Sequence, residues 1–189
     1  MSRIPPEATR VFNGEIFDVY QWQQPLFDGT TATFEALRRG STAFVLALQG
    51  EDVIYARQEQ PRKGVFRSLL GGRVEEGETP LQGAQRELLE EAGMASDSWA
   101  LVRTYHAPGK IEHDVYLFVA RECRVVAAQK LDAGERITLE RTPLDTFIRD
   151  VLGADDFLFR ELRAEIFSAY NAEAGVRFKA AVLGRFNQN

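Results

Sequence analysis

Hydrophobic and polar residues alternate along residues 10–40, in the rhythm of strands with one buried face. Residues 17–23 and 31–38 both alternate, and the turn signals Asn13-Gly14 and Asp28-Gly29 stand before each of them. Alternation of period two between such turns predicts an antiparallel hairpin. A hairpin of this size cannot bury itself in water. Residues 10–40 are therefore expected to form a small antiparallel annex that packs on another surface.

The rest of the chain carries short apolar runs between turn signals, which predict further strands and two closing helices. The expected strands are residues 43–48, 53–56, 101–105, 115–121 and 136–140, with loops at residues 61–64 and at Pro108-Gly109. Thr142-Pro143 suits the start of a helix that ends near Gly153. Apolar residues at helical spacing from Phe159 to Tyr170 predict a last helix ending near Gly175. This order indicates the α+β class.

The strongest local signal is a helix between residues 79 and 93. Thr79-Pro80-Leu81-Gln82 is a capping box with Pro at the first helical position, and Gly93 suits a left-handed cap. Glu87, Glu90 and Glu91 then lie on this helix. At about 100° per residue, their spacing puts three carboxylates on one face. Like charges at that distance repel, so something positive should sit against them.

Two kinds of positive partner fit these carboxylates. Oxygen-only ligands suit Mg2+ or Mn2+ rather than zinc. Arg86 is placed to pair with Glu90 one turn later, and with Glu78 if the preceding loop folds back. The alternative is a solvated helix face whose glutamates only keep the protein soluble. The surrounding glycines and charged residues at fixed positions disfavour that interpretation.

Composition and charge narrow the classes of function. At 189 residues the chain fits one domain, with or without a small annex. A net charge of −5 and a pI near 5.2 argue against a nucleic-acid partner. A single cysteine, Cys123, and two histidines argue against a disulfide or a zinc site. The N-terminus lacks an apolar signal region, and the longest apolar run, Ala43–Leu48, is far below the ~20 residues of a membrane span. We expect a soluble cytoplasmic protein without a membrane partner.

The segment Gly72–Met94 reads GRVEEGE, seven further residues, then RELLEEAGM, and so fills every fixed position of a Nudix box. The chain therefore resembles Nudix hydrolases, and the resemblance implies a mixed sheet between helices with the box as a loop-helix-loop at the active site. It implies an annex at residues 1–40 and a Nudix domain with C-terminal helices at residues 41–189. Implied metal ligands are Glu87, Glu90, Glu91 and the carbonyl of Gly71, with Mg2+ or Mn2+ as cofactor; Arg86 and Glu87 are implied to be catalytic, and Gly72, Glu78 and Gly93 structural.

A narrower likeness points to the ADP-ribose pyrophosphatase branch. It rests on the N-terminal hairpin, on Arg57-Gln58, and on the segment Tyr105–Gly109 with Pro108 fifteen residues after Gly93. That likeness implies hydrolysis of ADP-ribose or a related nucleotide sugar to a nucleoside monophosphate and a sugar phosphate. It also implies a homodimer in which the annex crosses to the partner subunit.

The chain departs from this branch at two places. The branch commonly carries Gln-aromatic-Arg where this chain has Gln58-Glu59-Gln60, and Pro-Ala-Gly where it has Leu70-Gly71-Gly72. Without an arginine at position 60, substrate phosphate contacts are expected from Arg57 or Arg62, and Pro108 is expected among the substrate-binding residues. The alternative for each arginine is a solvated surface charge.

The general base is expected in the loop after Pro108. The branch usually places a Glu there, and ungapped alignment puts His113 at that position, between Glu112 and Asp114. A carboxylate suits the field of metal ions better than an imidazole, which is easily captured as a ligand. We therefore expect Glu112 first, Asp114 second and His113 third, with a solvated loop charge as the alternative and Glu87 as the next candidate.

Aromatic residues of the annex allow two interpretations. Tyr20, Trp22 and Phe27 would stack on the substrate's base, or they would pack in a core or a dimer interface as strand aromatics commonly do.

Two competing functions are weighed against hydrolysis of a nucleotide sugar. One is a ligand-sensing module that keeps the fold without catalysis; the intact box and the lack of a fused basic helical domain disfavour it. The other is a triphosphatase that clears damaged nucleotides; the annex and Pro108 disfavour that.

Overall fold

The structure, a computed structural model, describes residues 3–151, 153–159 and 162. Its strands are β1 (Thr9–Asn13), β2 (Phe17–Pro25), β3 (Thr31–Arg39), β4 (Thr42–Gln49), β5 (Asp52–Gln60), β6 (Gly64–Ser68), β7 (Leu70–Arg73), β8 (Met94–Ala95), β9 (Ser98–His106), β10 (Ile111–Glu112), β11 (Asp114–Arg121), β12 (Arg124–Val125) and β13 (Arg136–Pro143). Its helices are α1 (Pro80–Ala92), α2 (Leu144–Thr146) and the π-helical turn η1 (Phe147–Val151). The prediction of an α+β class is confirmed.

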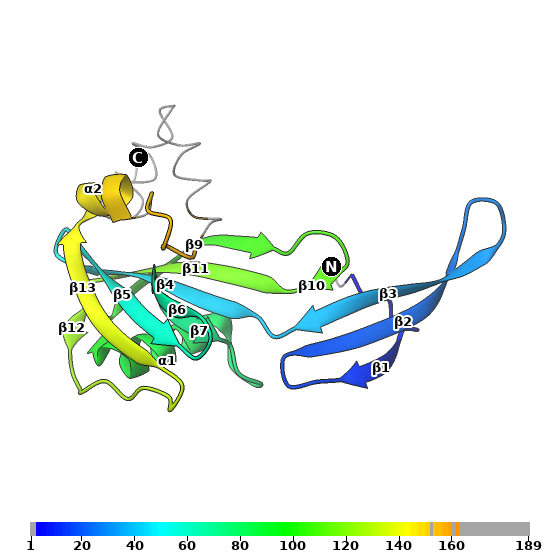
Figure 1. The fold of residues 1–189 in the computed structure, drawn as a ribbon, viewed down its shortest axis with the longest axis horizontal. Helices are drawn as coiled ribbons and strands as arrows, with labels where there is room; N and C mark the ends of the chain where they lie inside the picture. The colour runs from blue at the N-terminus through cyan, green and yellow to red at the C-terminus, as the bar shows by residue number, and fades with distance from the viewer. Residues whose placement is uncertain (1–2, 152, 160–161, 163–189) are drawn as a thin grey trace.

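The body is built on a mixed sheet in the order β13-β5-β4-β11-β9, with β6 paired to β5 and β7 paired to β4. The central strands β4 and β11 run parallel, while their other neighbours are antiparallel. Helix α1 lies on one side of this sheet and α2 on the other (Figure 1). Each side has its own apolar cluster, around Leu88 and Phe118 beneath α1 and around Phe147 and Phe157 on the other face.

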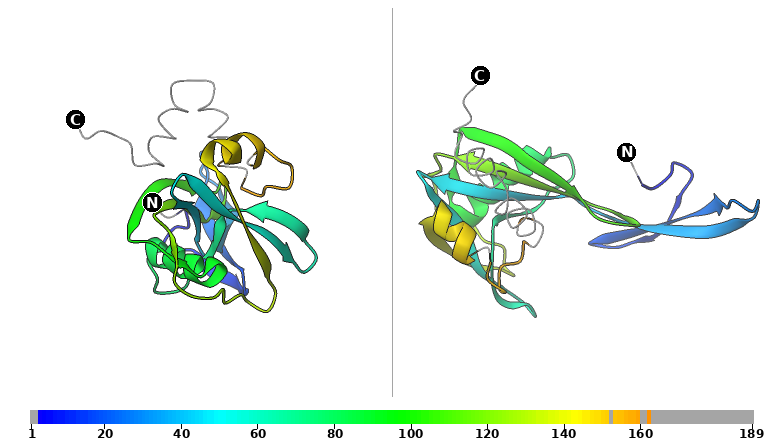
Figure 2. Two further views of the ribbon diagram at one scale, coloured as in Figure 1. Left: turned by 90° about the vertical axis from the view of Figure 1, so that its left-hand side faces the viewer. Right: turned by 90° about the horizontal axis from the view of Figure 1, so that it is seen from above.

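The annex is a second sheet in the order β1-β2-β3-β10, and it projects from the body as a long arm (Figures 1 and 2). Only Gly40 and Ser41 separate β3 from β4, and β10 pairs parallel with β3 just before β11 pairs parallel with β4. The stretch of chain that forms β3 and β4 therefore lies beside the stretch that forms β10 and β11 in both sheets. Among the annex strands, Ala36 is the single buried residue.

Large apolar side chains stay exposed on the annex. They are Val11, Phe12, Ile16, Phe17, Leu26 and Phe27. Trp22 and Phe34 face each other across β2 and β3 with ring centroids 6.0 Å apart, whereas Phe27 stands fully exposed at the tip. Exposed apolar side chains often mark a contact surface when they gather in one part of a protein. No other segment in the described part of the chain covers these side chains.

The closing helices differ in detail from the prediction. Strand β13 continues through Pro143 because it pairs with β5 along its whole length, so Thr142 is in the strand and the helical segment begins at Leu144. It ends at Val151, close to the expected Gly153. The helix expected from Phe159 to Gly175 lies outside the described residues, apart from Phe159 and Leu162. In the described ranges, the helices are too short or too polar to span a membrane.

Candidate active site

Helix α1 begins and ends where the sequence predicts. The Thr79 hydroxyl accepts from the backbone N–H of Gln82, and the Gln82 side chain accepts in return from the N–H of Thr79. Gly93 closes the helix in the left-handed conformation at φ 62°. A Cβ there would lie 2.2 Å from the carbonyl oxygen of Ala127, so only glycine fits. These caps hold the helix in register with the preceding loop.

Arg86 ties the box loop to the helix. Its guanidinium donates to Glu78 at 2.9 Å, to Glu87 at 3.0 Å and to Glu90 at 2.9 Å, and it also reaches the carbonyl oxygen of Arg73. The predicted pairs with Glu78 and Glu90 are therefore confirmed. The hydrogen bond from Arg86 is the main cause that lowers the pKa of Glu78 below its usual value.

Glu91 points into the sheet and is the buried member of the three helix carboxylates. It is 4% exposed, and its Oε2 accepts from the backbone N–H of Gly71 at 2.6 Å. Burial raises the pKa of Glu91 to about 8, and the charges of Glu87, Glu135 and Glu90 act in the same direction. Burial also raises the pKa of Glu87, although Arg86 opposes it. This concentration of negative charge would be relieved by a cation.

Two glycines let the loop before the helix come this close. Gly71 has φ 135°, and a Cβ there would lie 2.1 Å from the carbonyl oxygen of Ala43 on β4. A Cβ at Gly72 would meet the Glu87 carboxylate at 2.5 Å. Glycine is thus required at Gly71, where the loop packs on the backbone of the central strand, whereas a side chain at Gly72 would displace the Glu87 carboxylate.

A fourth carboxylate, Glu135, joins the site from a distant part of the sequence. The segment between β12 and β13 is fastened to the end of α1, because the N–H of Lys130 donates to the carbonyl oxygen of Glu90 at 2.8 Å and the Gln129 side chain donates to that of Glu91. Burial is the main cause that raises the pKa of Glu135 above its usual value. Sequence reasoning gave this residue no role; its one local signal is an acidic side chain immediately before a strand.

Glu91 and Glu135 line a cavity of about 490 Å³ beside the box, which we call the box cavity. Its other lining residues include the cations Arg39, Lys63 and Arg73, the apolar Phe44, Phe66, Leu158 and Phe159, the polar Thr42, Gln58, Gln60 and Ser68, and the loop glycines Gly71 and Gly72. Carboxylates and cations thus share one concave surface with aromatic walls. Such a surface suits a ligand that carries both phosphates and an apolar ring.

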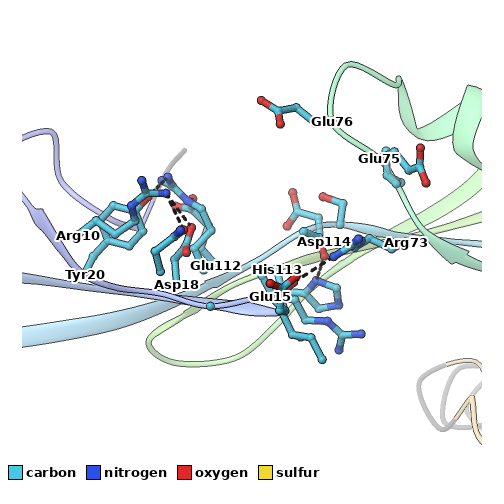
Figure 3. A pocket seen from close by; sticks show the side chains of 18 of the residues that line it. Arg10, Glu15, Asp18, Tyr20, Arg73, Glu75, Glu76, Glu112, His113 and Asp114 are labelled. Atoms are coloured by element: carbon cyan, nitrogen blue, oxygen red, sulfur yellow. Dashed lines mark hydrogen bonds and ion pairs between the residues drawn. The ribbon is translucent and has the colours of Figure 1, made fainter.

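A larger cavity of about 1170 Å³ lies between the annex and the body and is called here the annex cavity (Figure 3). The three loop residues proposed as bases lie here, each already engaged. Glu112 accepts from Arg38 at 2.6 Å and from the backbone N–H of Arg3 at 3.0 Å. The His113 ring donates from Nδ1 to the carbonyl oxygen of Gly40, and Asp114 pairs with His106. The role of Glu112 as a base stays a prediction.

The predicted substrate contacts lie elsewhere. Arg57, Arg62 and Pro108 are exposed, and none of them lines either cavity. Their part in substrate binding stays a prediction. The box cavity instead takes its cations from Arg39, Lys63 and Arg73, which sequence reasoning did not select.

The helix carboxylates already have a positive partner. In the described part of the chain, no three His, Cys, Asp or Glu side chains are arranged as a ready-made metal site. Arg86 instead occupies oxygens of both Glu87 and Glu90. The donor set is nevertheless composed of carboxylate and backbone oxygens, which are the ligands that hard divalent cations bind.

Comparisons with known proteins agree with the box. The family model for the NUDIX domain matches residues 37–165. The ADP-ribose pyrophosphatase of Bacillus subtilis (strain 168) is 24% identical over 144 residues, which cover 74% of this chain and 78% of that protein. The methanol dehydrogenase activator of Bacillus methanolicus is 30% identical over 145 residues, covering 74% of this chain and 77% of that protein.

The fold has a solved counterpart. The structure of an ADP compounds hydrolase matches with a TM-score of 0.70 at 19% identity, covering 88% of this chain and 91% of that one. The mixed sheet, the capped box helix and the family match lead to one assignment. The chain belongs to the Nudix family as a Nudix hydrolase, and within that family it is similar to the ADP-ribose pyrophosphatase branch.

Proposed function

We propose that this enzyme hydrolyses the diphosphate linkage of a nucleoside diphosphate derivative, with ADP-ribose or a related nucleotide sugar as its substrate. The products are a nucleoside monophosphate and a sugar phosphate. The observation that carries the proposal is the box cavity, which Glu91 and Glu135 line together with cations and aromatic rings. The similarity to an ADP-ribose pyrophosphatase supports the class of substrate.

The proposed cofactor is Mg2+ or Mn2+. Glu87, Glu90 and Glu91 offer carboxylate oxygens from one helix, and the carbonyl of Gly71 would complete the set with a backbone oxygen. Such an ion, when bound, polarises a phosphoryl oxygen and lowers the pKa of a bound water. Arg86 orients Glu87 and Glu90 from the other side through its paired hydrogen bonds.

The reaction also needs a group that takes a proton. The oxygen of water attacks one phosphorus, and a base removes a proton from that water. The bond between this phosphorus and the bridging oxygen breaks, and the bridging oxygen leaves with the other phosphate. Glu112 and Glu135 are the proposed candidates. The geometry favours Glu135, because it lines the same cavity as Glu91, whereas Glu112 is held by Arg38 and by backbone N–H groups in the annex cavity.

The annex is proposed to make the enzyme a homodimer. Residues 1–40 would then be a dimerisation element attached to a catalytic domain of residues 41–189. The support is the run of exposed apolar side chains on the arm, among them Phe12, Phe17 and Phe27. Covering them with a second copy would remove apolar surface from water and stabilise the arm.

A phosphate-release screen tests the function directly. Nucleotide sugars, dinucleotides and nucleoside triphosphates would each be incubated with the enzyme in Mg2+ and in Mn2+, and the products separated by chromatography. We expect a nucleoside monophosphate and a sugar phosphate from ADP-ribose or another nucleotide sugar. Turnover confined to triphosphates would contradict the proposal.

A further inference from the structure

Lys63 is held over the box cavity by an unusual turn. The N–H of Lys63 donates to the carbonyl oxygen of Gln60 at 3.1 Å, which closes the turn between β5 and β6. Arg62 and Gly64, on either side of Lys63, both have left-handed backbones, at φ 66° and 70°. An arginine rarely adopts that conformation, so the turn is fixed by its surroundings. The turn therefore gives the backbone of Lys63 a defined position.

The ammonium of Lys63 lies against an aromatic wall of this cavity. Its Nζ stands 4.1 Å from the centre of the Phe66 ring, and both residues line the box cavity. The Phe66 ring is buried, so the lysine stem covers it while the charge stays at the cavity surface.

Arg39 brings a second positive charge to the same place. It ends β3, lies over the Phe17 ring at 5.9 Å, and lines both cavities. Burial lowers the pKa of Lys63, and the charge of Arg39 adds to that effect. Among the described residues, neither Lys63 nor Arg39 makes an ion pair with a carboxylate, unlike Arg38 and Arg86. Two cations are thus held near each other without an acidic partner.

We propose that Lys63 and Arg39 form a phosphate clamp at the box cavity, binding the substrate phosphate that lies away from the helix carboxylates. The proposal rests on the proposed function and deepens it. Arg39 acts on the pKa of Lys63, and Glu135 acts on the pKa of Glu91, so each pair of like charges lies together among the residues that line the cavity. A diphosphate bound there would place one phosphate at each pair. The clamp would supply the positive charge that is missing at position 60, where this chain has a glutamine instead of an arginine.

The role of Gln60 follows from its contacts. Its Nε2 donates to Oε1 of Gln58 at 3.3 Å, and its side chain also hydrogen-bonds to Glu135. Gln58 is buried and donates in turn to Ser68. Gln60 therefore orients the Glu135 carboxylate. In the proposed clamp, the positive charge comes instead from Lys63, in the turn that follows Gln60.

Three variants test the clamp. Lys63→Met keeps the length of the side chain and its packing on Phe66 but removes the charge, and Lys63→Arg restores the charge. Lys110→Met is the matched control, because the Lys110 ammonium stands over the Phe34 ring at 4.2 Å in the same kind of contact outside both cavities. For Lys63→Met we expect KM to rise about tenfold or more while kcat changes by less than about threefold. Lys63→Arg should return KM to within about threefold of wild type, and Lys110→Met should leave it unchanged.

A binding measurement separates this proposal from the proposed function. Inorganic pyrophosphate would be titrated into the full chain in excess EDTA by calorimetry, and we expect Lys63→Met to weaken its affinity about tenfold relative to Lys110→Met. If the wild type is active and Lys63→Met has the same KM as the wild type, the clamp is overturned. If no nucleotide diphosphate is hydrolysed, the proposed function fails, and pyrophosphate affinity still decides the clamp. Equal affinity in both variants, or no binding to the wild type, overturns it.

Discussion

The box region and the annex reach their shapes by opposite routes. Between residues 70 and 93, each turn of the chain has a local cause: a capping box at Thr79, a left-handed glycine at Gly93, and Arg86 bridging loop and helix. In the annex, the pairing of β2 with β3 is regular, but several apolar side chains stay exposed to water. One region is stabilised within the chain. The other has a fold whose apolar side chains stay exposed within the described residues.

The two regions belong to separate sheets that are joined by neighbouring pairs of strands. Strands β3 and β4 are nearly continuous, and so are β10 and β11 (Figure 2). The central strands of the body therefore set the direction in which the annex projects. The body can therefore fix the place of the arm without burying it. A partner subunit would then meet a prearranged surface, which lowers the conformational entropy lost on association.

The largest effect is expected from the buried charge of the box. Glu91→Gln keeps the shape of the side chain but replaces the negatively charged carboxylate, a proposed metal ligand, with a neutral amide. Turnover should therefore fall roughly 10³-fold or more. The fold should persist, because the Gln amide still accepts from the N–H of Gly71. Steady-state kinetics and circular dichroism measure the two quantities. Full wild-type turnover in excess EDTA would rule out the metal mechanism.

The next effect compares two carboxylates outside the helix, one from each region. Glu135→Gln should lower kcat about 100-fold, the usual scale for a lost base, while Mn2+ affinity stays nearly unchanged. Glu112→Gln should loosen the contact of Arg38 with the loop and change kcat by much less. The reverse ranking of the two variants in kcat would assign the base to Glu112.

The annex should respond to charge on its apolar surface. Phe12→Asp and Phe27→Asp each put a carboxylate on the exposed face, and we expect the dimer dissociation constant to rise about tenfold or more. Val125→Asp is the control, since Val125 is 69% exposed on the body. Light scattering across micromolar concentrations measures the mass. A wild-type monomer at those concentrations would contradict the dimer.

Local rules predicted the box well and the tertiary additions to it poorly. The capping residues of α1 and the pairs of Arg86 follow from spacing alone. Glu135 enters through hydrogen bonds between the segment of residues 126–135 and the end of α1, and such long-range bonds leave no periodic signal. Lys63 was hidden in a turn whose backbone conformation the sequence does not specify.

The strands show the same division. Residues 17–23 and 31–38 alternate cleanly and were found as β2 and β3. Strand β7 was missed because Gly71 and Gly72 interrupt any apolar pattern, although Gly71 is needed for close packing on β4.

A smaller effect should appear in the pH dependence of stability without metal. The folded-state pKa of Glu91 is raised from 4.5 to about 8 by burial, so the folded protein binds this proton more tightly than the unfolded chain does. That contribution is fully present below about pH 4.5 and is lost as the pH rises towards about 8. In EDTA, Tm of the wild type should fall over this window relative to Glu91→Gln. If Tm changed with pH in the same way in the wild type and in Glu91→Gln, a raised pKa of Glu91 would be contradicted.

The smallest effect tests whether local capping distinguishes the two regions. Thr79→Ala removes the acceptor for the N–H of Gln82 and should cost about 1 kcal/mol of stability, or about 2–4 °C in Tm for a chain of this size. Thr33→Ala in the annex is the matched control, because its hydroxyl accepts from Gln23 in an exposed cross-strand contact that should contribute less than about 0.5 kcal/mol. Thr79→Ser should restore Tm, since serine caps equally well. Thermal melts in EDTA compare all three variants. Equal losses for Thr79→Ala and Thr33→Ala would mean that the box helix is held by its packing on the sheet, and that its cap adds no more than a surface hydrogen bond of the annex does.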